Sequence, residues 1–318
     1  MLGNNKKCTL PKVVVVTGAS GYIGRNLCVY LARKGVKIYA ISRKECVHFA
    51  EQNITVINGD ILHYKSMLSK IPLRVDALFH LAWNGCDTDE RNDMLLQIKN
   101  IDLAIATEAF AVALKCKRII FPGSPLEYQD GNKIISPGAV PAPHNSYGAV
   151  KVACHYILES LCKQDKIEFI YVMISSVYGL GRSQGIISYA IKSLLENKKT
   201  AFTKLEQYWD YVHIDDVVNG LWLILEKGKA GRFYCLGAGD NIRLEEYIKI
   251  IDKIIKPKVP LGIGELVYND GVIPQACVDL TTIYEDTGYK PRVSFSDAVR
   301  EIIQEEKNER TKRFVPVV

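Results

Sequence analysis

A run of four valines that leads into a glycine-rich turn restricts most strongly how this chain can fold. Valines occupy positions 13–16, and Thr17-Gly-Ala-Ser-Gly-Tyr-Ile-Gly24 follows them. The β-branched run predicts a buried strand, and the glycines predict a tight turn into a helix. Gly18 would permit the turn, Gly21 would let the backbone approach a pyrophosphate, and Gly24 would let the helix lie against the strand. Free amide groups at that helix N-terminus would then meet phosphates, so the motif predicts a dinucleotide site.

The first 125 residues continue this alternation of short apolar runs and amphipathic segments of helical length. Such alternation is typical of β-α-β units that build a parallel sheet. We therefore expect an α/β fold, a doubly wound parallel sheet of the Rossmann type with a smaller C-terminal α/β substrate lobe. The predicted strands lie at about 12–17, 36–41, 54–58, 76–81, 117–122 and 168–175, and the main predicted helices span about 91–115 and 146–163. Either Asn145 or Ser146 would cap the second of these helices.

The alternation weakens after Gly179-Leu-Gly181, and this change places the domain boundaries. Residues 1–176, with returning segments at about 207–236, are the predicted cofactor-binding Rossmann domain. Residues 177–206 and 237–318 combine helices and loops, and we assign them to the substrate-binding lobe.

Composition excludes several classes of partner. The net charge is +6, but no basic run is longer than two residues, so neither a nucleic acid nor a membrane surface is an expected partner. Nine cysteines without a Cys-x-x-Cys pair and six histidines without metal-site spacing indicate reduced thiols and no metal. No stretch approaches the ~20 apolar residues of a membrane span, and the first eleven residues do not resemble a signal sequence. A cytoplasmic protein is expected.

The end of the second predicted strand bears on which dinucleotide binds. NAD sites usually carry an acidic residue there, whereas NADP sites tend to carry an arginine near the 2′-phosphate. This chain reads Ile41-Ser-Arg43-Lys44, with no carboxylate before Glu45. NADP(H) is therefore favoured over NAD(H), with a merely solvated Arg43-Lys44 loop as the alternative.

Tyr147 and Lys151 stand four residues apart, one turn apart on the same face of the second predicted helix. The reference pKa of a phenol is ~10. We expect the Lys151 ammonium and the helix N-terminus to lower the pKa of Tyr147. Spacing alone would equally suit a solvated pair. The pair, however, follows a strand that ends at Gly123-Ser124, and it should project toward the carboxyl ends of the strands, where ligands bind.

At this point the chain resembles a known family, the extended short-chain dehydrogenase/reductases that include nucleotide-sugar epimerases, dehydratases and ketoreductases. The resemblance extends along nearly the whole chain. It is carried by Thr17-Gly-Ala-Ser-Gly-Tyr-Ile-Gly24, Gly59-Asp-Ile61, His80-Leu-Ala82, Asn100, Ser124 with Tyr128, Tyr147-Gly-Ala-Val-Lys151, Ser176-Val-Tyr-Gly179, Asp210-Tyr-Val-His-Ile-Asp-Asp-Val217 and Gly288-Tyr-Lys-Pro291.

The resemblance assigns roles to residues of this sequence. It implies that Ser124, Tyr147 and Lys151 are catalytic, and that Asp60 and Ile61 hold the adenine. The full expected cofactor set is Gly18, Ser20, Gly21, Tyr22, Ile23, Gly24, Arg43, Asp60, Ile61, Leu81, Ala82, Tyr147 and Lys151. The expected substrate residues are Trp83, Ser124, Arg182 and Trp209. His80 and Asn100 are as readily explained as satisfied polar groups in the core.

The chemistry that the resemblance implies is hydride exchange between a nicotinamide and a sugar carbonyl carbon. Tyr147 would exchange the proton on the oxygen, Ser124 would hydrogen-bond that oxygen, and Lys151 would hold the nicotinamide ribose. Dehydratases of this family carry Asp-Glu directly after the serine or threonine, whereas this chain has Pro125-Leu126. Glu127, one place later, should point away from the site.

We therefore expect an NADP(H)-dependent reductase of a keto group, at carbon 4, on a nucleotide-linked deoxysugar. An NAD-retaining nucleotide-sugar 4-epimerase is the alternative, and a non-catalytic dinucleotide-sensing protein is a third hypothesis. The family usually has an arginine where this chain has Trp209, and a second arginine is absent around 273–277. A substrate without a diphosphate thus stays open. By the same resemblance, the helices near 91–115 and 146–163 would pair with a second copy in a homodimer.

Overall fold

The computed structural model describes residues 13–129, 134–268 and 276–313. The outer ends of the expected domain ranges, 1–12 and 314–318, lie outside the described residues, as do residues 273–275 of the segment where a second family arginine is expected. A seven-stranded parallel sheet forms the centre, in the order β11-β7-β5-β4-β1-β2-β3. Its strands are β1 (Val13–Thr17), β2 (Lys37–Ser42), β3 (Ile54–Asn58), β4 (Ala77–His80), β5 (Arg118–Gly123), β7 (Glu168–Ile174) and β11 (Phe233–Leu236).

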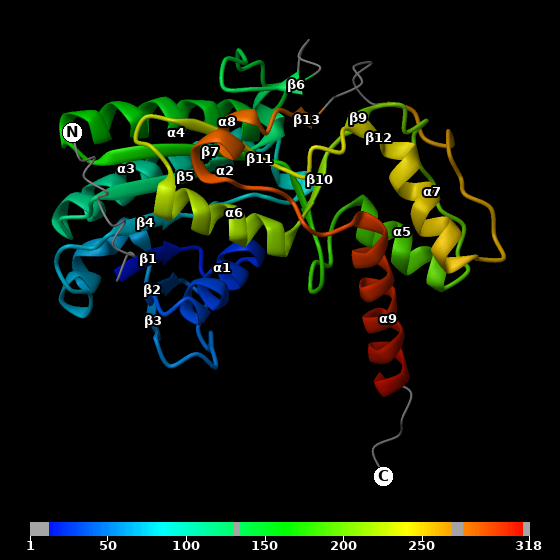
Figure 1. The fold of residues 1–318 in the computed structure, drawn as a ribbon, viewed down its shortest axis with the longest axis horizontal. Helices are drawn as coiled ribbons and strands as arrows, with labels where there is room; N and C mark the ends of the chain where they lie inside the picture. Colours follow the sequence, from blue (N-terminus) through cyan, green and yellow to red (C-terminus); the bar gives the residue numbers. More distant parts are fainter. Residues whose placement is uncertain (1–12, 130–133, 269–275, 314–318) are drawn as a thin grey trace, which may run out of the picture.

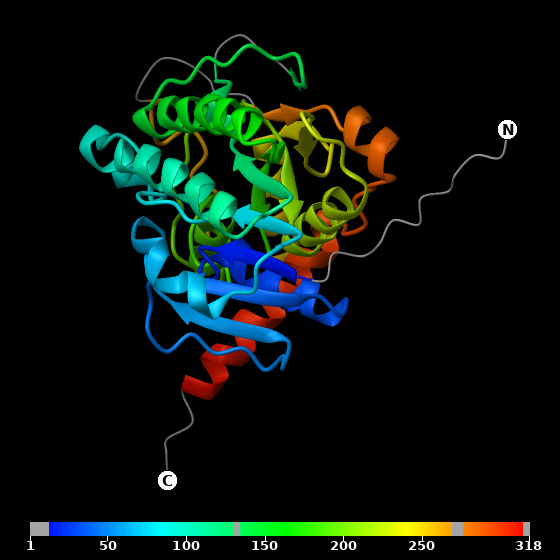
Figure 2. The same ribbon diagram turned by 90° about the vertical axis from the view of Figure 1, so that its left-hand side faces the viewer.

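The six predicted strands are confirmed to within two residues at each end, and β11 adds an edge strand that pairs with β7. The sheet contains one long apolar run after another because both of its faces are covered. On one face, α1 (Tyr22–Arg33) and α6 (Ile214–Lys227) pack together, and on the other face lie η1 (Ile61–Lys70), α3 (Lys99–Ala113) and α4 (Ser146–Gln164) (Figure 1). Figure 2 shows α3 and α4 side by side across their face. The predicted Rossmann architecture is confirmed.

The long helix predicted near 91–115 differs in detail. Residues 91–93 form a turn, and Asp93 caps a short α2 (Met94–Gln97) by accepting the Leu96 amide at 3.0 Å. The α3 helix then begins at Lys99. At the junction between α2 and α3, the Asn100 side chain donates to the Gln97 carbonyl at 3.0 Å. A side-chain donor of this kind competes with the hydrogen bonds of a continuous helix, so it accompanies the interruption.

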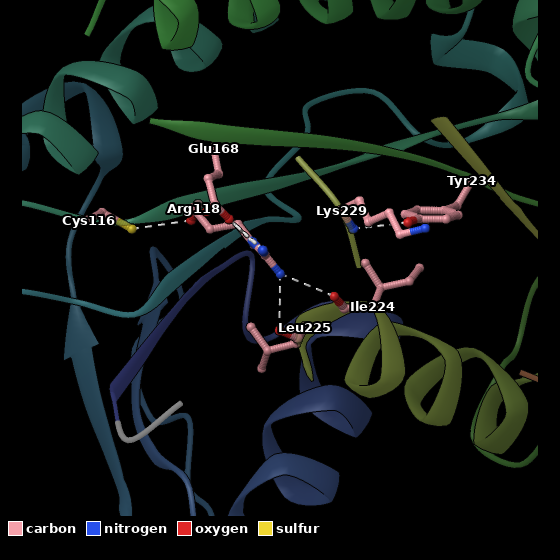
Figure 3. Close-up of polar contacts among 7 residues, drawn as sticks. All are labelled: Cys116, Arg118, Glu168, Ile224, Leu225, Lys229 and Tyr234. Atoms are coloured by element: carbon pink, nitrogen blue, oxygen red, sulfur yellow. Dashed lines mark hydrogen bonds and ion pairs between the residues drawn. The ribbon is translucent and has the colours of Figure 1, made fainter. Parts of the chain in front are cut away.

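The C-terminal end of α6 is tied to the sheet through one arginine. Arg118, at the start of β5, donates to the carbonyl groups of Ile224 and Leu225 at 3.4 and 3.1 Å and forms an ion pair with Glu168 of β7 (Figure 3). A cation at a helix C-terminus satisfies carbonyl groups that have no partner within the helix. This contact fixes the amino-terminal edge of the sheet, opposite the glycine turn.

The second lobe lies beyond the carboxyl ends of the strands. It contains α5 (Ile186–Leu195), α7 (Leu244–Ile255) and α9 (Phe295–Arg313), on the right of Figure 1. Two short strand pairs lie between the lobe and the sheet. In the parallel pair, β8 (Ser176–Tyr178) pairs with β10 (Tyr211–His213). In the antiparallel pair, β9 (Tyr208–Trp209) pairs with β12 (Ile242–Arg243). A further parallel pair joins β6 (Ile134–Ile135) to β13 (Cys277–Val278). The lobe has its own apolar cluster around Tyr211, Tyr247 and Phe295.

One segment lies in a different unit from the one we assigned. Residues 237–318 were placed in the substrate lobe, but α8 (Thr281–Thr287) packs against α6 and β11. Ile283 and Tyr289 belong to the same apolar cluster as α1 and α6, and the Tyr289 hydroxyl donates to the Gly237 carbonyl at 2.8 Å. The chain therefore returns to the Rossmann unit once more than the sequence pattern indicated.

Among the helices that the structure describes, none combines the length and the apolar character needed to cross a membrane. The eight cysteines within the described ranges are free thiols. In the same ranges, no cluster of three or more histidine, cysteine, aspartate or glutamate side chains is arranged to hold a metal ion.

Candidate active site

A cleft of about 1070 Å³ opens at the carboxyl ends of the parallel strands, between the sheet and the second lobe. Its walls come from the glycine turn, the ends of the central strands, the start of α4 and the β8 and β9 segments. Every residue predicted for the site lines this cleft: Gly18, Ser20, Gly21, Tyr22, Ile23, Gly24, Arg43, Asp60, Ile61, Leu81, Ala82, Trp83, Ser124, Tyr147, Lys151, Arg182 and Trp209. Glu127 does not line it, in agreement with its predicted orientation.

The glycine turn forms a backbone cradle in the cleft. Gly18 has φ +66°, and a Cβ atom there would lie 2.7 Å from the Leu81 carbonyl group. A Cβ atom at Gly24 would lie 2.3 Å from the Gly18 oxygen. Gly21 precedes α1, and no side chain caps that helix. The first amides of α1 therefore face a cavity of ligand size, and the residues present fit a dinucleotide, with its pyrophosphate at this helix N-terminus.

The ends of β2 and β4 are joined by Arg43. Its guanidinium donates to the Asn84 side chain at 2.8 Å and is exposed at the rim of the cleft. Asn84 is itself held by the buried Asn100, which accepts the Asn84 amide at 2.8 Å and donates to the Asn84 carbonyl at 3.1 Å. Asn100 is therefore a buried polar group whose side chain is hydrogen-bonded, as one of its two expected roles requires. Asp60 caps η1 by accepting the Leu62 amide at 3.0 Å.

The start of α4 positions the tyrosine. Asn145 is the N-cap and accepts the Gly148 amide at 2.8 Å, which confirms one of the two predicted caps. Gly148 is required because a Cβ atom there would lie 2.2 Å from the Leu126 oxygen, so α4 packs closely against η3 (Pro125–Glu127). Tyr147 consequently lies close to Ser124, and the Ser124 side chain lowers the pKa of the phenol.

Lys151 is buried beneath the tyrosine. Its Nζ donates to the Pro122 carbonyl at 2.8 Å and lies 3.9 Å from the Trp83 ring centroid and 5.9 Å from that of Tyr147. Trp83 is held in place by its own indole N–H, which donates to Gln97 Oε1 at 3.0 Å. The ammonium of Lys151 thus lies against one carbonyl group and three aromatic rings, since the Phe121 ring centroid is 4.8 Å from its Nζ.

The expected lowering of the Tyr147 pKa by Lys151 is not found. Burial raises the pKa of Tyr147, and the negative charges of Cys86 and Glu127, when they ionise, raise it further. The groups that oppose this are Arg91, by its charge, and Ser124, by its hydrogen bond. Burial also lowers the pKa of Lys151. The correction has a simple cause, because the sequence shows the ammonium but not the desolvation of both groups.

Arg91 and Cys86 are site residues that sequence reasoning missed. Both line the cleft, and the Arg91 side chain donates to the Cys86 carbonyl at 3.0 Å. The Arg91 carbonyl accepts the Tyr147 amide at 2.9 Å, and its guanidinium carbon lies 5.8 Å from the Tyr147 ring centroid. Neither residue belongs to a motif. The one feature of the sequence that could have indicated them is their position in the polar segment after the fourth strand, because ligands bind at the carboxyl ends of the strands.

The substrate side of the cleft contains few cations. Trp209, which stands where a family arginine is expected, donates its indole N–H to the Ser176 hydroxyl at 2.8 Å. Arg182 lies with its guanidinium carbon 5.4 Å from the Tyr22 ring centroid, near the glycine turn. Arg243 stacks on Tyr208 and does not line the cleft. Arg182 is therefore the cation that the described part of the second lobe brings to the cleft.

His80 belongs to the core beneath the site. It is buried, its Nδ1 lies 2.9 Å from the Thr107 hydroxyl, and its ring stacks on Phe121. Burial and the charge of Lys151 lower its pKa to about 3, so the imidazole is neutral at physiological pH. This favours a place in the core over direct chemistry, but the buried Nε2 of His80 has no hydrogen-bond partner among the described residues, so the group is only partly satisfied.

Comparison with known proteins agrees with this geometry. The sequence model of the NAD dependent epimerase/dehydratase family matches residues 14–237. A dTDP-D-glucose 4,6-dehydratase from Dictyostelium discoideum is 26% identical over 78% of this chain, which spans 64% of that relative's length. A dTDP-4-dehydro-6-deoxyglucose reductase from Escherichia coli is 21% identical over 92% of this chain and 96% of that protein. The fold matches UDP-glucose 4-epimerase of Thermotoga maritima with a TM-score of 0.82 at 19% identity, covering 93% and 99% of the two chains.

Proposed function

The chain belongs to the NAD dependent epimerase/dehydratase family of enzymes, and within that family we propose that it reduces a keto group, at carbon 4, of a nucleotide-linked deoxysugar. The observation that carries this proposal is the composition of the cleft beside Ser124. The complete set of Ser124, Tyr147 and Lys151 lines the cleft, but the two positions after the serine are Pro125 and Leu126. Such a site can exchange a proton on oxygen, and it lacks the adjacent acid and base that water elimination requires.

In the proposed reaction the bound nicotinamide supplies a hydride to the carbonyl carbon. The Tyr147 phenol donates its proton to the carbonyl oxygen, and the raised pKa of Tyr147 keeps that proton in place until it is needed. The Ser124 hydroxyl, which lies close to the phenol, would hydrogen-bond and orient the same oxygen. Lys151 would hold the nicotinamide ribose, and the charge of Arg91, which lowers the pKa of Tyr147, would favour the phenolate left after transfer.

We propose NADP(H) as the cofactor, because Arg43 and Lys44 line the rim of the cleft at the end of β2. Arg43→Ala should weaken NADPH binding about tenfold or more and change NADH binding little, since a charge-assisted hydrogen bond contributes about 1.5–3 kcal/mol. Calorimetric titration of cofactor-free protein with each dinucleotide measures this. Arg33→Ala, at the far end of α1 with a side chain 73% exposed, is the matched control. Equal loss for both dinucleotides would contradict the NADP assignment.

The nucleotide-sugar class of substrate is proposed from the relatives, one of which is named as a reductase of dTDP-4-dehydro-6-deoxyglucose. The direct test is to supply that keto-sugar with NADPH, follow loss of absorbance at 340 nm, and identify the product alcohol. Turnover supports the proposal. Protein that retains NAD through purification and interconverts 4-epimers without added NADPH would show the alternative activity, a nucleotide-sugar 4-epimerase.

We also propose a homodimer that pairs α2, α3 and α4 with their copies. Leu95 is 78% exposed, and Ile98 and Ile105 are 50% and 44% exposed along the same helices. Leu95→Asp with Ile105→Asp should give a monomer in sedimentation equilibrium, because charge cannot be buried in an apolar helix interface without a large cost. Leu73→Asp, 58% exposed outside these helices, should leave the mass unchanged. A wild-type monomer at micromolar concentration would contradict the proposal.

A further inference from the structure

The carboxyl end of β5 gathers three polar side chains from three different elements. Lys151 of α4 donates to the Pro122 carbonyl at 2.8 Å. The Tyr171 hydroxyl of β7 lies so close to Gly123 that a Cβ atom there would be 1.9 Å away. The Glu127 carboxyl accepts the Ser124 amide at 2.6 Å. The ammonium of Lys151, the phenol of Tyr171 and the carboxyl of Glu127 thus lie against three consecutive residues, 122, 123 and 124, the last of which is the proposed catalytic serine.

Glu127 is fully buried and both of its carboxyl oxygens are engaged. Oε1 accepts the Ser124 amide, and Oε2 accepts the Tyr171 hydroxyl at 2.8 Å. The Ser124 side chain in turn accepts the Leu126 amide at 3.3 Å, which completes a capping box around η3. Lys151 and Glu127 bond to Pro122 and Ser124, two residues apart at the end of β5, so both side chains lie at this strand end. The charge of Lys151 lowers the pKa of Glu127, and the charge of Glu127 raises the pKa of Lys151.

We propose that Glu127 is a positioning residue of the catalytic group, holding the Ser124 backbone in place and supplying the countercharge that keeps the Lys151 ammonium charged. The proposal deepens the proposed function, because it concerns the same proton chemistry. Lys151 is a buried ammonium with one carbonyl acceptor and three aromatic rings around it, and a nearby carboxylate favours its charged form.

The groups that face Glu127 determine the pH at which this countercharge is present. Burial raises its pKa to about 7, against the lowering effects of the Lys151 charge and of the hydrogen bonds from Tyr171 and Ser124. Since the pKa is raised, Glu127 is neutral below about pH 7 and becomes a carboxylate as the pH rises through that value. The countercharge for Lys151 is therefore complete only above about pH 7.

Glu127→Gln separates the charge from the structure. A capping box accepts glutamate or glutamine at its third position, so the variant should fold and keep the Ser124 contact. The reactivity of Lys151 is measured in the full-length, cofactor-free protein by competitive labelling with acetic anhydride and mass spectrometry. At pH 8 the variant should be labelled up to about tenfold faster, because loss of an opposite charge lowers the pKa of Lys151 and so raises the fraction of reactive amine. At pH 6 the two proteins should react alike, since Glu127 is then neutral in the wild type as well.

Two further variants locate the effect. Tyr171→Phe removes a hydrogen bond that lowers the pKa of Glu127, so Glu127 should ionise at a higher pH in this variant. Labelling of Lys151 in Tyr171→Phe should therefore begin to differ from that in Glu127→Gln only at a higher pH than it does in the wild type. Glu127→Asp keeps a charge and should restore part of the pH dependence. Lys163, exposed on the last turn of α4, is the internal control and should react equally in all proteins.

A ratio of labelling rates that stays constant between pH 6 and pH 8 would overturn the proposal and leave Glu127 a purely structural cap. This measurement needs no sugar, so its failure is distinct from failure of the proposed function. With active enzyme, the alkaline limb of the kcat/KM profile should move to lower pH in Glu127→Gln. An unmoved limb would also overturn the proposal.

Discussion

Replacement of Tyr147 by phenylalanine should lower kcat for keto-sugar reduction by a factor of about 10² to 10⁴, the usual contribution of general acid–base catalysis. The ring of Tyr147 packs edge-on against Trp83 at 5.6 Å, and phenylalanine preserves this contact. NADPH binding should therefore change little, and the loss should fall on kcat. The measurement is steady-state oxidation of NADPH together with calorimetric binding of the cofactor.

Tyr156→Phe is the matched control, because Tyr156 lies on the same helix, is 52% exposed and does not line the cleft. It should have wild-type kinetics. If Tyr147→Phe retained most of its activity, proton donation by another group, with Arg91 and Cys86 as the neighbouring candidates, would replace the proposed mechanism.

Gly18→Ala should abolish measurable cofactor binding and lower the free energy of unfolding by about 2–5 kcal/mol. A left-handed backbone costs an alanine about 1–2 kcal/mol, and its Cβ atom would lie 2.7 Å from the Leu81 carbonyl group, an overlap with a typical cost of about 1–3 kcal/mol. The backbone that must move is the cradle itself. Urea unfolding and calorimetric titration with NADPH measure the two effects.

Gly35→Ala provides the comparison. Gly35 also has a positive φ, +81°, but nothing lies within 4 Å of a Cβ atom built there. The free energy of unfolding of Gly35→Ala should fall only by the cost of a left-handed alanine backbone, about 1–2 kcal/mol, and the variant should bind NADPH normally. Equal destabilisation of the two variants would mean that the close approach of the glycine turn to β4 is not what makes Gly18 necessary.

The sequence predicted the sheet and the cleft lining because both depend on local patterns. Four valines and three spaced glycines define β1 and its turn, and parallel strands bring their carboxyl ends to one edge, so motif residues 100 positions apart meet without further information. Asn145 could be recognised as a helix cap for the same reason, since capping is a contact over three residues.

The parts that could not be predicted depend on burial and on contacts between distant segments. The sequence shows Lys151 four residues from Tyr147, but not that its Nζ is directed to the Pro122 carbonyl or that desolvation raises the pKa of the phenol. Arg91 follows no motif and reaches the site only because the turn before α2 folds back onto α4. The bond from Tyr171 to Glu127 joins residues 44 positions apart.

The return of residues 281–289 to the Rossmann unit has a consequence for protein engineering. Ile283 and Tyr289 fill the core beneath α6, although they follow most of the second lobe in the chain. A chimera in which a relative supplies everything after residue 237 would therefore pack the relative's side chains, in place of Ile283 and Tyr289, into the core of this chain. If substrate specificity is to be transferred in the proposed function, 177–206, 238–268 and α9 should be grafted together, because α7 packs on α9, with α8 left in its native context.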